Sequence, residues 1–358
     1  MSGFGDSAVK VGQTIEESFD RFKLRVRQRY GWTAPPEVVT YRGHGTREIL
    51  FMKGRVLGAK GLTRSSATDT VRTNLRNMLR RFMSAEVPFA RLRAAHNGQE
   101  VTVVADEEGF FDVRFELSQP PDAGTAWHPV EVELLGAAGP GVRAEGRVLV
   151  PEGARFGVIS DLDDTVIQTG VTSLLTMLRT ALLKNAYTRL PFEGVTHFYR
   201  ALQGEGNPIF YVSSSPWNLY DLLEDFLDVH DVPAGPIFLK DWSPTNLKSH
   251  KEHKLGTIRT LLATYPSLPF VLVGDSGEQD PEIYRTVVRE NPGRIAAVYI
   301  RDVTTEERDV VVHAIARQVR SFGVEMVPVQ NTAEAAEHAT RSGLISPEAL
   351  PEVRKASG

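Results

Sequence analysis

The sequence predicts a mixed α/β fold, in which a β-rich, sandwich-like N-terminal domain precedes a doubly wound parallel sheet. Before about residue 150, short runs of alternating apolar and polar residues are separated by turn signals, which is typical of antiparallel strands. From residue 156 onward, continuous apolar runs alternate with helical segments, which indicates parallel strands covered on both faces. A length of 358 residues also makes two domains the default expectation.

The N-terminal domain, residues 1–150, is expected to contain two helices and several short strands. One helix is predicted near residues 12–30, and a second over residues 69–83, where Val71, Leu75 and Met78 recur on one helical face. We find no chemical motif in this domain, so scaffolding, membrane docking and dimerisation all remain open as its role. The predicted strands are Val38–Tyr41, Ile49–Met52, Phe89–Leu92, Val101–Val104, Phe110–Leu117, Val130–Leu135 and Val142–Val150.

Residues 151–335 are expected to form the parallel sheet with its helices, followed by a helical tail over 336–358. The predicted strands are Phe156–Ser160, Pro208–Ser213, Ile237–Leu239, Phe270–Gly274 and Ile295–Ile300. The predicted helices are Trp217–Val229, Glu252–Tyr265 and Pro281–Glu290. In such sheets the reactive groups lie at the carboxyl ends of the strands, so the residues that follow each apolar run are candidates for the functional site.

Three acids follow the first of these strands, in the sequence Asp161-Leu-Asp-Asp-Thr165. Carboxylates two residues apart at a strand end repel one another, and burial adds a desolvation cost. A divalent cation that prefers oxygen ligands, such as Mg²⁺, would compensate both effects. The spacing also allows Asp161 to attack while Asp163 transfers a proton. Taken alone, an acidic turn after a strand would explain the same residues.

Two further strand ends carry groups that could serve the same site. Ser213–Ser215 precede a helix and could bind an anion, although such hydroxyls taken alone more often form an N-cap and turn. Asp275 and Asp280 follow another strand, either as cation ligands or as part of a solvated turn. Lys254 lies between these two strand ends in the sequence, at a helix start. It is a candidate site residue because a phosphate site with two acidic clusters needs a positive charge.

In their order and context, these groups resemble the four motifs of the haloacid dehalogenase-like (HAD) phosphatase superfamily, over about residues 155–335. In detail they look like the App1-type phosphatidate phosphatase family, as do the β-rich N-terminal domain and the ending Val327–His338. The resemblance implies a HAD-like, Rossmann-like sheet with a small helical flap. It also implies Mg²⁺-dependent release of phosphate from phosphatidate. The motifs that carry it are Asp161–Thr165, Ser213–Asn218, Lys254–Ile258 and Gly274–Asp280.

The resemblance implies a role for each residue of the motifs. Asp161 would be the nucleophile that becomes an aspartyl-phosphate, and Asp163 would protonate the leaving group and then activate water. Lys254 would complete the catalytic set together with Ser213, and Lys251 would replace it if the helix register differed. The substrate phosphate would be bound by Ser213, Ser214, Lys254 and Thr165.

The same resemblance implies a metal site. Mg²⁺ would lie between Asp161, the backbone carbonyl of Asp163 and Asp275. Asp280 has two possible roles, because it would either complete the metal shell or orient Lys254. The sequence does not decide between them.

Between the first and second strand ends lies an insert of about 40 residues, which begins with the apolar segment Val171–Lys184. A helix that is apolar nearly all round is either a buried flap or a membrane-contacting lid, and this one is too short to span a bilayer. On the predicted helix 69–83, Arg72, Arg76 and Arg80 form a basic stripe. The stripe is either a solvated face or a contact for anionic lipid headgroups.

Composition excludes several classes of function. With 41 Lys and Arg against 45 Asp and Glu, the chain carries no bulk positive charge for nucleic-acid binding. It has no cysteine, which excludes disulfides and thiolate chemistry and fits a reducing compartment. Neither a signal peptide nor a membrane-spanning run is evident, so we expect a cytoplasmic protein, peripheral at the membrane if the lid interpretation is correct. The oligomeric state is not predicted.

Two other functions fit the same motifs. One is a HAD phosphatase that acts on a soluble phosphomonoester or a phosphoprotein. The other is a non-catalytic lipid- or protein-binding module, against which the intact Asp161 and Asp163 argue. A receiver-type signalling domain is disfavoured because its acid pair and its nucleophile lie on different strands. A P-loop kinase is disfavoured because the chain has no P-loop motif.

Overall fold

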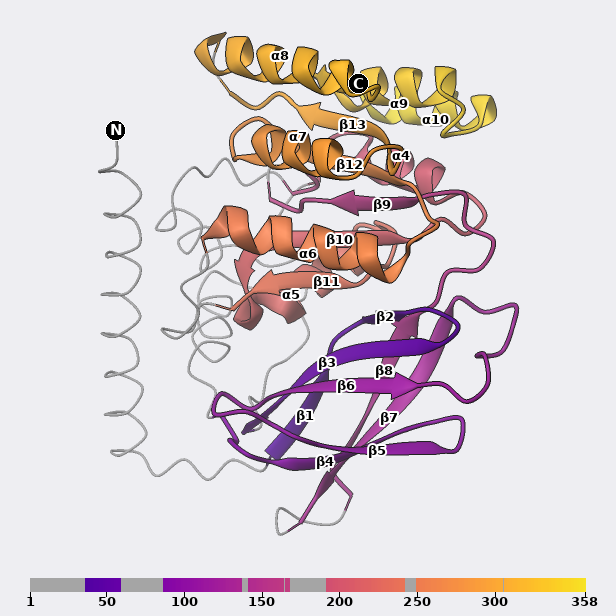
Figure 1. Cartoon of the computed structure of the whole chain (residues 1–358), viewed down its shortest axis with the longest axis vertical. Helices are drawn as coiled ribbons and strands as arrows, with labels where there is room; N and C mark the ends of the chain where they lie inside the picture. The colour runs from indigo at the N-terminus through magenta and orange to yellow at the C-terminus, as the bar shows by residue number, and fades with distance from the viewer. Residues whose placement is uncertain are drawn as a thin grey trace, which may run out of the picture.

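The computed structural model describes residues 36–58, 86–136, 141–163, 165–167, 191–241, 249–304 and 306–358. Within these ranges the chain forms one sheet of eight strands and one of six (Figure 1). Several predictions lie outside the described residues. They are the helices at 12–30 and 69–83 with Arg72, Arg76 and Arg80, the flap segment Val171–Lys184, and Asp164.

The first sheet confirms the predicted β-rich N-terminal part. Its order is β1-β3-β2-β8-β7-β4-β5, with β6 beside β3. The short strand β2 pairs antiparallel with β3 and parallel with β8, so it joins two halves into one hydrogen-bonded sheet. Apolar side chains from both halves, such as Phe115 and Val132, share one core. The strands are β1 (Pro36–Thr40), β2 (Gly43–Gly45), β3 (Ile49–Gly58), β4 (Arg91–His96), β5 (Gln99–Val104), β6 (Phe110–Glu116), β7 (Trp127–Leu135) and β8 (Arg143–Leu149).

The second sheet confirms the predicted parallel sheet, since every strand pair in it is parallel. Its order is β11-β10-β9-β12-β13-β14. The first strand in the sequence, β9, is central, the next two strands lie on one side of it, and the last three lie on the other side. The strand order therefore changes side at β9, and open α/β sheets bind their ligands at such a position. The strands are β9 (Gly157–Ser160), β10 (Ile209–Pro216), β11 (Ile237–Lys240), β12 (Phe270–Asp275), β13 (Ile295–Arg301) and β14 (Met326–Val329).

Helices cover both faces of the parallel sheet, and each face has its own apolar core (Figure 1). Successive strand residues point to opposite faces, so Val158 and Ile159 of β9 belong to different cores. One face carries α4 (Val195–Gln203), α5 (Tyr220–Val229), α9 (Thr332–Arg341) and α10 (Leu350–Ala356). The other carries α6 (His250–Thr264), α7 (Asp280–Glu290) and α8 (Glu306–Ser321). In the described part of the chain, none of the helices has the length and apolar character needed to cross a bilayer.

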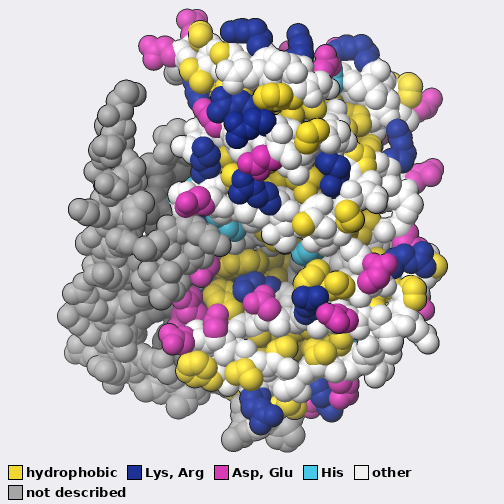
Figure 2. Space-filling model, in the orientation of Figure 1, with side chains coloured by type: hydrophobic (Ala, Val, Ile, Leu, Met, Phe, Trp, Pro, Cys, Tyr) yellow, Lys and Arg dark blue, Asp and Glu magenta, His cyan; other side chains and the backbone are white. Residues whose placement is uncertain are grey.

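The predicted helices correspond to α5, α6 and α7, with ends that differ by at most three residues. The elements β2, β14, α4 and α8 were not predicted. β2 is only the tripeptide Gly-His-Gly, and β14 contains Pro328, so neither shows the alternation that marks a strand. On the visible face of the molecule, Figure 2 shows acidic and basic side chains intermixed, which fits the near balance of charges in the sequence.

The two sheets contact each other on the side of β10 and β11 (Figure 1). Arg42, which follows β1, forms ion pairs with Glu224 at 2.9 Å and Asp228 at 2.7 Å on α5. His44 of β2 lies against Phe238 of β11, with ring centroids 5.3 Å apart. The N-terminal sheet is therefore attached by ion pairs on one face of the parallel sheet and by buried aromatic packing near its edge.

Burial at this interface should make stability depend on pH through His44. Burial lowers the pKa of His44 to about 4, whereas an unfolded histidine titrates near about 6.5. Between these two pKa values the unfolded chain binds more protons than the folded chain does. The free energy of unfolding therefore decreases as the pH falls from 6.5 towards 4. Between pH 7.5 and 5 the unfolding free energy of the wild type should fall about 2 kcal/mol further than that of His44→Phe. Urea unfolding at both pH values measures this difference, and equal losses would contradict it.

Candidate active site

Four buried ionisable side chains meet at the carboxyl ends of β9 and β12. Asp161 follows β9, Asp275 ends β12, Asp280 begins α7 and Lys254 lies on α6. None of the four is more than 2% exposed. Because β9 and β12 are neighbours in the sheet, their carboxyl ends bring together acids that are more than a hundred residues apart in sequence.

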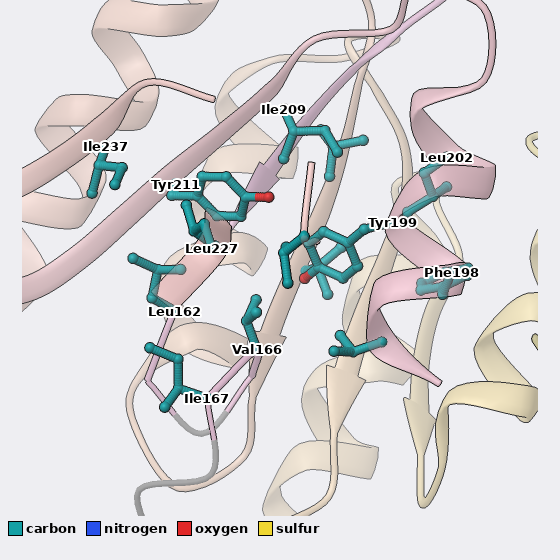
Figure 3. Close-up of a cluster of buried hydrophobic side chains, with 14 of the residues drawn as sticks. Leu162, Val166, Ile167, Phe198, Tyr199, Leu202, Ile209, Tyr211, Leu227 and Ile237 are labelled. Atoms are coloured by element: carbon teal, nitrogen blue, oxygen red, sulfur yellow. The ribbon is translucent and has the colours of Figure 1, made fainter. Parts of the chain in front are cut away.

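The backbone that carries Asp161 is fixed by the sheet and by apolar anchors. Its amide donates to the carbonyl of Val273 at 2.9 Å, which extends the pairing of β9 with β12. The following residues Leu162, Val166 and Ile167 point into the apolar core around Tyr199 and Tyr211 (Figure 3). Asp163 thus lies between anchored residues on both sides.

The start of α6 determines which lysine reaches the site. Ser249 and Glu252 form a capping box, in which the Ser249 hydroxyl accepts from the Glu252 amide at 3.2 Å and the Glu252 carboxylate accepts from the Ser249 amide at 2.7 Å. This register buries Lys254 together with Ile258, whereas Lys251 is exposed. Of the two lysines considered from the sequence, the structure brings Lys254 to the carboxylates.

Lys254 is the positive centre of the group. Its ammonium nitrogen lies 3.0 Å from Asp161 Oδ1, 2.7 Å from Asp280 Oδ1 and 2.9 Å from Glu278 Oε2. Burial by itself lowers the pKa of Lys254, but the three carboxylates outweigh burial and raise the pKa well above its usual value. The lysine therefore stays charged and holds the acids in place.

Asp280 lies against the end of β12 because Gly274 leaves room for it. A Cβ at position 274 would overlap the Asp280 carboxylate. Asp280 Oδ1 accepts from Lys254, and Oδ2 accepts from the backbone amide of Asp275 at 3.3 Å. Both oxygens thus contact protein donors, which favours an orienting role towards Lys254 over a full share in a metal shell.

Two buried oxygens in this group have no hydrogen-bond partner among the described residues, namely Asp161 Oδ2 and Asp275 Oδ2. Asp161, Asp275 and Asp280 each offer an oxygen within 4.8 Å of the others. Burial raises the pKa of Asp275 to about 8 and raises the pKa values of Asp161 and Asp280 as well. Negative charge in excess of one lysine and two unpaired carboxylate oxygens fit a divalent cation with oxygen ligands.

Asp163 faces a different set of groups. Its Oδ2 accepts from the hydroxyls of Ser213 at 2.9 Å and Ser215 at 3.0 Å. The Ser213 hydroxyl in turn accepts from the Ser215 amide at 3.0 Å. Asp163 is half-buried and its side chain is not part of the cluster of three aspartates, so the two acids of the first motif have different surroundings. The sequence placed Ser215 in a possible anion site with Ser213 and Ser214 and did not predict its contact with Asp163.

The other two predicted phosphate-binding residues, Ser214 and Thr165, are both buried. Thr165 lines a small cavity together with Tyr199, Tyr299 and Arg301, and none of the three clustered aspartates lines that cavity. The structure therefore brings Asp161, Lys254, Asp275 and Asp280 into one group and Asp163 with Ser213 into a second. It does not place Thr165 in the first group.

Arg308 of α8 supports the loop between Asp275 and Asp280, and sequence reasoning missed it. Its guanidinium donates to the backbone carbonyls of Ser276 and Glu278, each at 2.9 Å. It also forms a two-point ion pair with Glu282 at 2.7 and 2.9 Å. An arginine in the first turns of an acidic helix gives no sign in the sequence that it reaches a loop about 30 residues earlier.

Comparisons with known proteins match this part of the chain. Residues 156–302 match the family model described as the catalytic domain of phosphatidate phosphatase APP1. Over 164 residues, the chain is 37% identical to phosphatidate phosphatase APP1 of Saccharomyces cerevisiae, which covers 44% of this chain and 28% of the relative. Over 164 residues it is 30% identical to an uncharacterised protein of Schizosaccharomyces pombe, covering 42% of this chain and 26% of the relative. The match thus spans only about a quarter of each relative's length.

Two solved structures show distant likenesses to this chain. A carbohydrate acetylesterase from Xanthomonas citri aligns over 80% of this chain and 75% of its own, with 15% identity and a TM-score of 0.26. The tandem immunoglobulin repeats of Dlar align over 38% of this chain and 63% of theirs, with 16% identity and a TM-score of 0.20. Neither likeness is close enough to support a conclusion.

Removing Arg308 should weaken cation binding by the aspartate cluster, because the loop between Asp275 and Asp280 loses the arginine that supports it. For Arg308→Met we expect the Mg²⁺ concentration that gives half-maximal thermal stabilisation to rise about tenfold, the usual cost of losing a residue that orients metal ligands. Thermal melts over a MgCl₂ series measure this value. Arg285→Met is the matched control, because Arg285 is a half-buried arginine of α7 that bonds Gln318 on α8 and not the loop after Asp275. An unchanged midpoint in Arg308→Met would contradict the expected role.

Proposed function

Since this chain belongs, through residues 156–302, to the App1-type phosphatidate phosphatase family, we propose that it is a Mg²⁺-dependent phosphatidate phosphatase. It would hydrolyse phosphatidate to diacylglycerol and inorganic phosphate. The observation that supports this most is the buried group of Asp161, Lys254, Asp275 and Asp280 at the ends of two adjacent strands. We also propose a HAD-like fold, because the second sheet is all-parallel and its strand order changes side at β9.

In the proposed reaction, Asp161 is the nucleophile. Lys254 holds Oδ1 at 3.0 Å, while Oδ2 has no hydrogen-bond partner among the described residues. A carboxylate oxygen of Asp161 attacks phosphorus and the ester P–O bond breaks, so that the phosphoryl group is transferred to the enzyme as an aspartyl-phosphate. The anchored backbone on either side of Asp163 keeps this geometry fixed before the substrate arrives.

Asp163 supplies the proton transfers. Its carboxyl group protonates the departing alkoxide, and the resulting carboxylate then takes a proton from the water that attacks the aspartyl-phosphate. The P–O bond to Asp161 breaks, phosphate leaves and both carboxyl groups return to their starting states. The hydroxyls of Ser213 and Ser215, at 2.9 and 3.0 Å, keep the Asp163 side chain in one position throughout.

Mg²⁺ would be held by Asp161, Asp275 and the backbone carbonyl of Asp163, and when bound it neutralises charge on the phosphate. Lys254 adds the remaining positive charge and keeps Asp280 and Glu278 oriented. A lipid substrate would require contact with a membrane surface, so we propose a cytoplasmic protein that acts at the membrane periphery.

The proposal is tested by phosphate release from phosphatidate in mixed micelles, with soluble phosphomonoesters assayed beside it. We expect release from the lipid that depends on Mg²⁺ and stops with a chelator. Release from the soluble esters alone would keep the phosphatase mechanism and refute the lipid substrate. If no phosphomonoester were hydrolysed, the proposed function would be wrong.

Asp161→Asn should abolish turnover, because the amide is not a nucleophile, and it should not lower the melting temperature, since it removes one of several crowded buried acids. Near-normal activity in this variant would refute the role of Asp161. Steady-state assays and thermal melts on the same preparation separate loss of chemistry from loss of fold.

Asp163→Asn should slow turnover at least ~100-fold, the usual contribution of a positioned acid–base group. The asparagine keeps the size of the side chain and can still accept a hydrogen bond from the two serines, so the fold should not change. A loss of less than about tenfold would mean that another group transfers the proton.

A further inference from the structure

The segment Ser213–Ser215, which bonds Asp163, lies where the regular strand pairing of β10 stops. β10 pairs with β9 from Ile209 to Tyr211, and with β11 at Tyr211 and Val212. The pairing with β11 then shifts register and resumes only at Pro216. Sheet hydrogen bonding therefore fixes both ends of this segment better than its middle, and the position of the far end matters for where the serines point.

The N-terminal sheet holds that far end through Trp217, two residues after Ser215. The indole ring stacks on Tyr41, which follows β1, with centroids 4.8 Å apart and planes 22° from parallel. Phe110 of β6 meets the same indole edge-on at 6.2 Å. On its own sheet, Trp217 stacks on Tyr220 of α5 at 6.1 Å. The indole is thus packed between residues of both sheets.

Arg55 of β3 holds the next residue, Asn218. Its guanidinium donates to the Asn218 side-chain oxygen at 2.7 Å. The other donors bond Glu86 at 3.2 Å and the carbonyl of Glu108 at 2.9 Å, and the guanidinium carbon lies 4.2 Å from the centre of the Phe110 ring. With a side chain only 6% exposed, Arg55 is locked within the N-terminal sheet and directs one donor across to the other sheet.

These contacts form a continuous path from the N-terminal sheet to Asp163. Tyr41 and Phe110 pack against Trp217, Arg55 bonds Asn218, and Pro216, whose ring restricts its φ, joins Trp217 to Ser215. Ser215 and Ser213 then bond the same oxygen of Asp163 at 3.0 and 2.9 Å. We infer that the N-terminal sheet positions the acid–base residue of the catalytic sheet, with Arg55 as its principal positioning residue. The inference rests on the role proposed above for Asp163.

The chemistry of the first step shows how misplacement would appear. When Asp161 takes the phosphoryl group, the ester oxygen leaves with the electron pair of the P–O bond and accepts the proton of Asp163. An alkoxide, as from phosphatidate, leaves poorly without that proton, whereas 4-nitrophenolate leaves readily as the free anion. A displaced Asp163 should therefore lower kcat/KM for the alkyl ester and spare the aryl ester.

The test compares Arg55→Met with the wild type on phosphatidate and on 4-nitrophenyl phosphate, using the full chain with Mg²⁺. We expect kcat/KM for phosphatidate to fall about tenfold, mainly through kcat, and kcat/KM for the aryl ester to change less than about twofold. Asp163→Asn should show the same selectivity in stronger form. Asn218→Ala removes the acceptor from the other sheet and should reproduce the effect, and the double variant should be no worse than either single one.

Arg42→Met is the matched control, because Arg42 joins the same two sheets through Glu224 and Asp228 without touching Trp217 or Asn218. It should leave the ratio of the two kcat/KM values unchanged. Equal losses on both esters in Arg55→Met, or the same selectivity in Arg42→Met, would overturn the inference while leaving the proposed function intact. A wild type that hydrolyses neither ester would instead refute the proposed function.

Discussion

The site depends on one electrostatic constraint, the burial of several carboxylates around a single ammonium group. Asp161, Asp275 and Asp280 repel one another, and burial raises the pKa of each. Lys254 offsets part of this cost, and two carboxylate oxygens remain without donors among the described residues. Such an arrangement needs a surrounding structure that holds the acids in position, and either protonation or a bound cation relieves the repulsion between them.

Several local features of the surrounding structure hold the buried acids in position. The cap at Ser249 sets the register of α6, Gly274 lets Asp280 approach, and Arg308 ties down the loop between two of the acids. Apolar anchors such as Leu162 fix the backbone around Asp161, the proposed nucleophile. Each is modest by itself, yet together they orient the reacting groups before a substrate binds, which is where enzymes of this kind gain most of their rate.

The two sheets contribute differently to this arrangement. The parallel sheet and its helices carry the residues of the proposed site, because the carboxyl ends of β9 and β12 are neighbours, and the strands of the N-terminal sheet carry none of these residues. It instead packs against the segment that follows Ser215, through Trp217 and Asn218. In the proposed reaction, the N-terminal sheet would thus influence catalysis through the position of Asp163.

The sequence alone determined the parallel sheet, most of its strands and the residues that gather at its carboxyl ends. These features follow from local patterns, because an apolar run predicts a buried strand and the acids directly after it must lie at the strand end. Tertiary structure decided which groups contact one another. Asp280 accepts a hydrogen bond from Lys254, and Ser213 donates one to Asp163. Arg55 donates one to Asn218, which lies 163 residues later in the sequence. Such partners are set by the packing of elements distant in the chain, and no local pattern records them.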